Sequence, residues 1–138
     1  MNRRHAAELL GRLHRAQGRF YAGVGGDELR ELLSERVTWS VPGENAIAGY
    51  YEGIDAVMGY FCRRRDLARR SLRLHPRDLL TGVGEMAASI TEGSAILEGR
   101  EQRWSTVGLY RLGLHRVQAC WLLPLDQAAF DRIWAAAE

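Results

Sequence analysis

The sequence contains no lysine: all 19 of its basic residues are arginines, and they stand against 17 acidic residues. The resulting formal net charge of +2 is small, acidic residues are interleaved almost throughout, and no recognised nucleic-acid motif is present. These features argue against a nucleic-acid partner. One cluster of basic residues remains, at positions 63–65 and 69–70, and we interpret it as a solvated face near a helix end, where cations are favourable.

Long apolar runs and cysteine motifs are also missing. No window reaches the roughly 20 apolar residues that a membrane span needs, and the N-terminus has no apolar segment typical of a secretion signal. The two cysteines, Cys62 and Cys120, lie far apart and fit no metal or redox spacing, as expected for free thiols in a reducing cytoplasm. Four scattered histidines add no ligand set, and AGVGGDE lacks the lysine of a phosphate loop. We therefore expect no metal, no cofactor and no membrane partner.

The first half of the chain has a helical pattern. Ala6, Leu9, Leu13 and Phe20 recur at helical spacing and predict an amphipathic helix over residues 3–22. A short helix over 28–34, capped by Asp27, is expected to follow, and then a strand over 36–41 that stops at Pro-Gly. A third helix, capped by Asp55, should run to about residue 70.

The second half is typical of strands. SLRLHPRDLL, MAASITEGSAIL, RWSTVGLYRL and RVQACWLLPL are separated by glycine-containing turns, as in antiparallel hairpins. Asp126 then resembles the N-cap of a closing segment. This order of elements predicts one α+β domain over residues 1–138. Apolar residues of both parities in RWSTVGLYRL indicate a curled sheet. Its concave face would hold helices and a pocket, and its convex face would need a partner.

Three segments resemble one known family. They are W-S-V-P-G-x-N-x-I-A-G-x-Y-x-G at 39–53, STVGLYRLGLHRVQACW at 105–121, and W-L-L-P-L-D-Q at 121–127. With the helix order, they resemble SnoaL-like proteins, which are polyketide cyclase-like members of the nuclear transport factor 2-like (NTF2-like) superfamily. The resemblance implies a cone-shaped, curled, mixed or antiparallel sheet wrapped around N-terminal helices, with the pocket on its concave face.

The same resemblance indicates where this chain departs from related enzymes. Ser40 and Gly108 stand where similar sequences often have histidine, and SVPG lacks the aspartate that steroid isomerases use as a base. The isomerase tyrosine of the first helix would fall near Arg19. Several acid-base positions of the family are therefore vacated, and Gly108 would leave a gap beside Tyr110.

Two residues remain as candidates for acid-base chemistry. Asp126 follows the last-strand tryptophan at the family's position for a catalytic or structural acid, although helix capping is the competing interpretation. His75, in LRLHPRD, is a candidate proton donor or a rim residue. His5, His14 and His115 are expected on a helix exterior or in a turn.

Aromatic residues give the predicted binding surface. A set around the cone mouth would suit a flat aromatic or polycyclic ligand; its members are Trp39, Tyr50, Phe61, Trp104, Tyr110 and Trp121. The turn at Pro42-Gly43 would fold the chain so that Tyr50 and Tyr51 close over the pocket.

Three functions are consistent with the predicted fold and the candidate residues. The first is a cofactor-free acid-base enzyme, of the cyclase or isomerase kind, acting on a hydrophobic polyketide-like or aromatic metabolite. The second is a binding protein that sequesters or carries such a molecule, and the third is a protein-interaction module. We also expect a homodimer formed through the convex face of the sheet.

Overall fold

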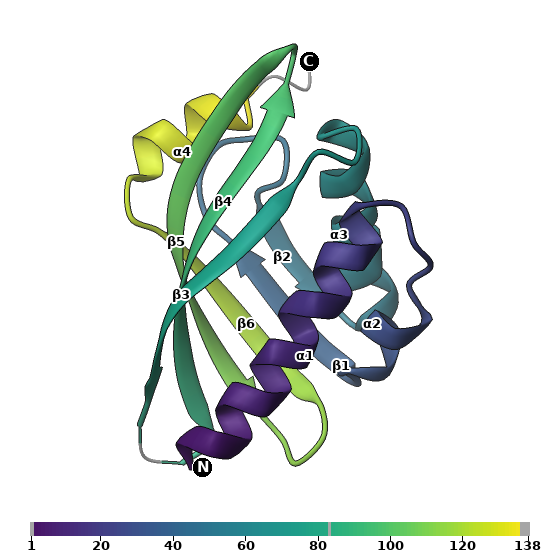
Figure 1. The fold of residues 1–138 in the computed structure, drawn as a ribbon, viewed down its shortest axis with the longest axis vertical. Helices are drawn as coiled ribbons and strands as arrows, with labels where there is room; N and C mark the ends of the chain where they lie inside the picture. Colours follow the sequence, from purple (N-terminus) through teal and green to yellow (C-terminus); the bar gives the residue numbers. More distant parts are fainter. Residues whose placement is uncertain (1, 83, 136–138) are drawn as a thin grey trace.

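The computed structural model describes residues 2–82 and 84–135. The predicted α+β order is confirmed (Figure 1). None of the described helices is both long and apolar enough to cross a membrane. The elements are α1 (Arg3–Tyr21), α2 (Asp27–Glu31), β1 (Leu33–Val41), β2 (Gly49–Glu52), α3 (Ile54–Leu67), β3 (Arg73–Thr81), β4 (Met86–Leu97), β5 (Arg100–Leu112), β6 (Val117–Pro124) and α4 (Gln127–Ile133).

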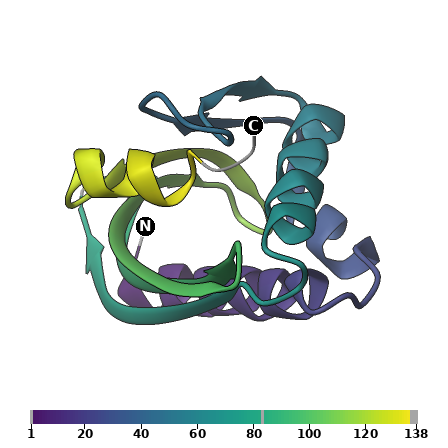
Figure 2. The same ribbon diagram turned by 90° about the horizontal axis from the view of Figure 1, so that it is seen from above.

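The strands form one mixed sheet with the order β2-β1-β6-β5-β4-β3. Strands β3 to β6 are antiparallel neighbours, as the hairpin turns predict, whereas β1 pairs with β6 in parallel. The sheet does not close, because β2 and β3 form its two edges. Figure 2 shows the long strands curling between α1 on one side and α4 on the other. The structure therefore has the curled sheet of the expected cone.

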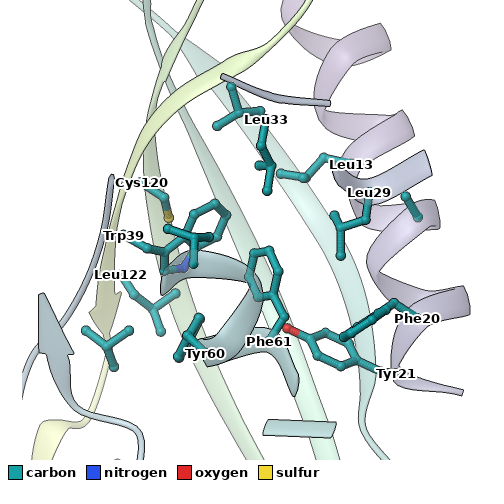
Figure 3. Close-up of a cluster of buried hydrophobic side chains, with 14 of the residues drawn as sticks. Leu13, Phe20, Tyr21, Leu29, Leu33, Trp39, Tyr60, Phe61, Cys120 and Leu122 are labelled. Atoms are coloured by element: carbon teal, nitrogen blue, oxygen red, sulfur yellow. The ribbon is translucent and has the colours of Figure 1, made fainter. Parts of the chain in front are cut away.

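Helices α1 and α3 cover the concave face. The apolar stripe of α1 is buried along its whole length, from Ala6 through Leu13 to Phe20, as its helical spacing requires. Helix α3 buries Val57, Met58, Tyr60 and Phe61 on the sheet side. In Figure 3 the side chains of Trp39, Tyr60, Phe61 and Tyr21 point toward one another between the helices and the sheet. The core is therefore largely aromatic at the place where a pocket was expected.

Two predicted helix caps are wrong by one or two residues. Gly26 and Gly53 are the N-caps of α2 and α3, and neither makes a side-chain capping bond. Asp27 and Asp55 lie inside the first turns, where a carboxylate is favourable next to the helix N-terminus. The second predicted helix also ends early, because β1 begins at Leu33.

Candidate functional site

Four of the predicted aromatic residues lie on the concave side. Register places Trp39 beside Cys120 and Cys120 beside Tyr110, so these three form one row across β1, β6 and β5. Trp104 has the same parity on β5, and Phe61 reaches the row from α3, with its ring centroid 5.0 Å from that of Trp39. All four aromatic side chains are buried.

Two others lie on the opposite face. Trp121 pairs with Ser40 and with Leu109, and both neighbours have convex parity. Its ring lies under Arg111, whose guanidinium carbon is 5.5 Å from the ring centroid. Tyr50 also pairs with Ser40 and is 62% exposed. The structure thus separates Trp121 and Tyr50 from the other four predicted residues.

Aromatic rings fill most of the concave interior. The centroids of Trp39 and Tyr110 are 6.1 Å apart, and those of Trp104 and Trp134 are 5.3 Å apart. The expected gap at Gly108 is absent, since a Cβ built there would lie 2.7 Å from the Tyr110 ring. Tyr110 thus occupies the space that the missing side chain releases. A polycyclic ligand does not fit between these rings as they stand.

What remains inside is a chamber of about 20 Å³, which is roughly enough for one water molecule. Its lining is unusually polar for a core. It consists of His14, Gln17, Trp39, Arg64, Leu74, Thr91, Trp104, Thr106, Gly108, Tyr110 and Leu122.

Unpartnered polar atoms gather at this chamber. Within the described part of the chain, five buried side-chain atoms lack a hydrogen-bond partner. Gln17 Oε1, Trp39 Nε1 and Arg64 Nε belong to residues that line the chamber. The other two, on Tyr60 and Trp134, belong to rings that surround the Arg64 guanidinium. Each such atom costs about 1–3 kcal/mol when it is buried alone, so their concentration in one place makes this region the candidate site.

A groove of about 330 Å³ lies outside the chamber, between α1 and β3. Its apolar walls come from Ala7, Leu10, Pro76 and Leu79, and Arg3, Arg77, Asp78 and Ser89 provide polar groups. His14 lines both the groove and the chamber. The groove has the size of a small-ligand site, and His14 is the residue that the linings of the groove and the chamber share.

His14 was expected on the helix exterior, and that prediction is wrong. The residue is half-buried, its ring meets the Tyr110 ring edge-on with centroids 6.3 Å apart, and it faces the sheet. Burial lowers the pKa of His14 to about 4, although a hydrogen bond to the backbone of Leu10 raises it in part. The imidazole is therefore neutral at pH 7. The sequence offered one signal for this inward position: His14 follows Leu10 by four residues and precedes Gln17 by three, which places it on the same helix face as these two buried residues.

The buried tyrosines and the buried cysteine of the interior are held in their neutral forms. Burial raises the pKa of Tyr21, of Tyr60 and, well above its usual value, of Tyr110. Burial likewise raises the pKa of the Cys120 thiol, so this cysteine is a core residue and not a nucleophile. Among these groups, His14 is the one whose neutral form can accept a proton in mild acid.

His75 lies away from the chamber. It is exposed on β3 and pairs with Glu92, which has convex parity. It lines a separate surface hollow of about 300 Å³, where Arg77 donates a hydrogen bond to Glu92 over 3.1 Å. The structure therefore does not bring His75 to the concave site.

Asp126 is an exposed helix cap. Its Oδ1 accepts a hydrogen bond from the backbone N–H of Ala129 over 3.0 Å at the start of α4. The carboxylate does not line the chamber or the groove. Of the two interpretations weighed from the sequence, this geometry supports capping.

We expect two substitutions at Asp126 to behave differently. Asp126→Asn should leave stability almost unchanged, because asparagine caps nearly as well as aspartate, whereas Asp126→Ala should lower the free energy of unfolding by about 0.5–2 kcal/mol. Urea denaturation measures both. Equal stability of the Ala and Asn variants would contradict a stabilising cap.

The stretch Pro42-Gly43 has a different role from the one expected. A Cβ on Gly43 would lie 2.1 Å from Asp131 Oδ1, so the turn packs directly on α4. Asn45 and Gln127 both donate hydrogen bonds to Asp131, over 2.7 and 2.9 Å, and the Asn45 bond is the main cause that lowers the Asp131 pKa. The turn fixes α4 and does not fold Tyr50 over a pocket.

No protein-family model and no curated protein matches the sequence. Solved structures do match the fold. Bal32a, from a soil-derived mobile gene cassette, has a TM-score of 0.82 and 22% identity over 94% of this chain and 98% of its own. An NTF2-like protein of unknown function from Burkholderia pseudomallei has a TM-score of 0.76 and 18% identity over 99% and 100% of the two chains.

A third similar structure contains a named small molecule. TerC, co-crystallised with polyporic acid, has a TM-score of 0.73 and 15% identity over 91% of this chain and 94% of its own. These likenesses establish that the chain has the NTF2-like fold. At such identities they show the fold alone.

Proposed function

We propose that this NTF2-like fold binds a small aromatic metabolite in the groove between α1 and β3, with a polar end of the ligand directed past His14 into the chamber. The observation that carries the proposal is the gathering of unpartnered buried atoms at the chamber, which shares His14 with the groove. A ligand that satisfies them would remove a desolvation cost that the protein alone leaves in place.

The shape of the site supports a ligand of modest size. The groove offers apolar walls on both sides, from Leu10 on α1 and Leu79 on β3, which suit one or two aromatic rings. The chamber has room for about one oxygen atom, so only the end of the ligand would enter it. TerC, of similar fold, was co-crystallised with polyporic acid, which supports small-molecule binding by this architecture.

Calorimetric titration with one- to three-ring aromatic compounds that carry one polar group tests the proposal. We expect saturable binding by the wild type and at least about tenfold weaker binding, or 1.4 kcal/mol, by Ala7→Phe, because the added ring would fill the groove that Ala7 lines.

The matched control is Glu8→Phe, which adds the same ring at the next, exposed position of α1, where the residue does not line the groove. This variant should bind as the wild type does. A panel without saturable binding, or equal weakening by both variants, would contradict the proposed site.

A cofactor-free acid-base enzyme of the cyclase or isomerase kind is the second candidate. One observation favours it: His14 is neutral at pH 7 and lies where the ligand would pass. A pKa of about 4 nevertheless makes the free imidazole a weak base, since general bases work best with a pKa near the operating pH. We therefore place binding first. Turnover that His14→Gln abolishes without weakening binding would reverse this order.

We further propose a homodimer formed through the convex face. Two apolar rows cross that face, one through Trp121, Leu109 and Leu80 and one through Leu123 and Val107. Leu80 and Leu123 are 57% and 48% exposed. A stable isologous interface needs roughly 1,200 Å² of total burial.

Sedimentation velocity at micromolar concentration should therefore show a dimer, and Leu80→Arg, which places a charge on the exposed end of one row, should shift it toward monomer. A wild type that sediments only as a monomer would contradict the proposed interface.

A further inference from the structure

Arg64 is the main departure from the expected solvated arginine face. It belongs to the basic cluster of the third helix, yet it is only 4% exposed and lines the interior chamber. Three rings surround its guanidinium carbon: those of Tyr21 and Tyr60 at 5.4 Å and that of Trp134 at 5.9 Å from the centroids. Its neighbours Arg63 and Arg65 instead reach the backbone of Ala46 and the carboxylate of Asp66.

The buried charge of Arg64 has no anionic partner in the described residues. Its Nη1 donates to the hydroxyl of Tyr21 over 3.2 Å, and its Nε has no hydrogen-bond partner there. None of the ion pairs found within residues 2–82 and 84–135 includes it. The surrounding phenols cannot supply the charge, because burial raises the pKa of Tyr21 and of Tyr60 and keeps both neutral at pH 7.

A buried guanidinium is costly unless it is paired, because it stays charged at any physiological pH. Cation–π contacts with the three rings offset part of this cost. They do not satisfy the N–H groups, which need oxygen acceptors. Trp39 Nε1 is a second unpartnered donor at the same chamber, whereas Gln17 Oε1 is one unpartnered acceptor. Donors, one of them charged, therefore dominate the free hydrogen-bonding groups.

Resting on the proposed function, we infer that the site selects anionic aromatic ligands, and that a carboxylate-type oxygen of the ligand is the partner of Arg64 and Trp39 at the chamber. The groove itself is close to neutral, because Arg3 lies there with the carboxylate of Asp78, and Arg77, which also lines it, pairs with Glu92. The selection for an anion therefore rests on Arg64 and Trp39. A neutral ligand of the same shape would leave the Arg64 charge unpaired.

Calorimetry with a matched pair of compounds tests the inference. 2-Naphthoate and 2-naphthamide have the same rings and nearly the same shape, and they differ in charge. Because a hydrogen bond to a charged group contributes about 1.5–3 kcal/mol, we expect the wild type to bind the carboxylate about 10- to 100-fold more tightly than the amide. Arg64→Met should remove this preference, and Arg64→Lys should keep part of it.

The outcomes separate this inference from the proposed function. Equal affinities of the wild type for the two compounds would overturn charge selection and leave the groove intact as a binding site. An Arg64→Met variant that weakens both compounds equally, with the ratio preserved, would show a purely structural role and overturn it too. If Arg64→Met does not fold, the wild-type ratio and the Arg64→Lys ratio decide. Binding of neither compound would contradict the proposed site itself and, with it, the charge selection.

Discussion

Replacing His14 with glutamine should make the protein more resistant to mild acid. Free histidine titrates near 6.5, whereas burial lowers the pKa of folded His14 to about 4. Between these values the unfolded chain binds a proton that the folded chain does not, so the free energy of unfolding falls as the pH falls through this window. The loss reaches at most about 3 kcal/mol, at 1.36 kcal/mol per pKa unit.

His14→Gln removes this titration, so the stability of the variant relative to the wild type should rise as the pH is lowered from 7.5 to 4. The charged and titratable groups around His14 are Arg64 and Tyr110 at the chamber and Arg3, Arg77 and Asp78 at the groove. Burial is the largest cause of the lowered pKa of His14; the cationic neighbours disfavour a second positive charge, whereas the carboxylate of Asp78 favours it. Urea denaturation at a series of pH values provides the measurement.

His115, exposed in the turn between β5 and β6, provides the control. The pH dependence of the His115→Gln variant should run parallel to that of the wild type. If His14→Gln also ran parallel to the wild type, the imidazole would not be buried as described, and its place at the groove would be wrong.

Gly93→Ala should destabilise the protein by about 1–3 kcal/mol, the usual cost of adding a methyl group to a filled core. Gly93 pairs with Trp104 across β4 and β5, and a Cβ built on it would lie 2.4 Å from two atoms of the indole. The ring cannot move aside easily, because the rings of Phe130 and Trp134 pack edge-on against it at 6.4 and 5.3 Å.

Gly59→Ala is the matched control, since an added Cβ on exposed Gly59 of α3 meets nothing within 4 Å. There alanine should stabilise the helix by up to about 1 kcal/mol. Thermal or urea unfolding compares the two variants. Wild-type stability of Gly93→Ala would mean that Trp104 is free to move, which would also weaken the description of the filled interior.

The elements could be predicted because local patterns determine them. The apolar stripe from Ala6 to Phe20 recurs at helical spacing throughout, so it predicts a helix without ambiguity. The turns of the second half separate strands that pair with their sequence neighbours. Asp126 before Gln127 has a capping signal that needs no tertiary contact.

The face on which a strand residue lies was harder to predict where both parities are apolar. Cys120, Trp121 and Leu122 are all apolar, so the alternation that normally reveals the buried face is absent. Trp121 belongs to the predicted aromatic set at the cone mouth, yet it lies on the convex face. Tyr50 and Tyr51 present the same problem. Register shows that Tyr51 pairs with Trp39 and packs on Tyr60, with centroids 4.7 Å apart, while Tyr50 points outward.

The site itself depends on long-range packing, which sequence patterns do not specify. His14 and Arg64 are polar residues beside buried stripes, and polar residues there usually lie in solvent. Both face inward because α1 and α3 pack against each other over the concave face, so that side chains of both helices line the same chamber. Gly108 predicts a gap only if its neighbours stay in place, and the Tyr110 ring occupies that space.

Histidine resonances followed by NMR during titration with 2-naphthoate test the central claim most directly. The four histidines lie in four different places, and only His14 lines the groove and the chamber. Saturating ligand should shift the His14 ring signals and leave those of His5, His75 and His115 unchanged. Shifts at His75 with His14 unchanged would instead place the ligand in the hollow on the convex side and contradict the site proposed here.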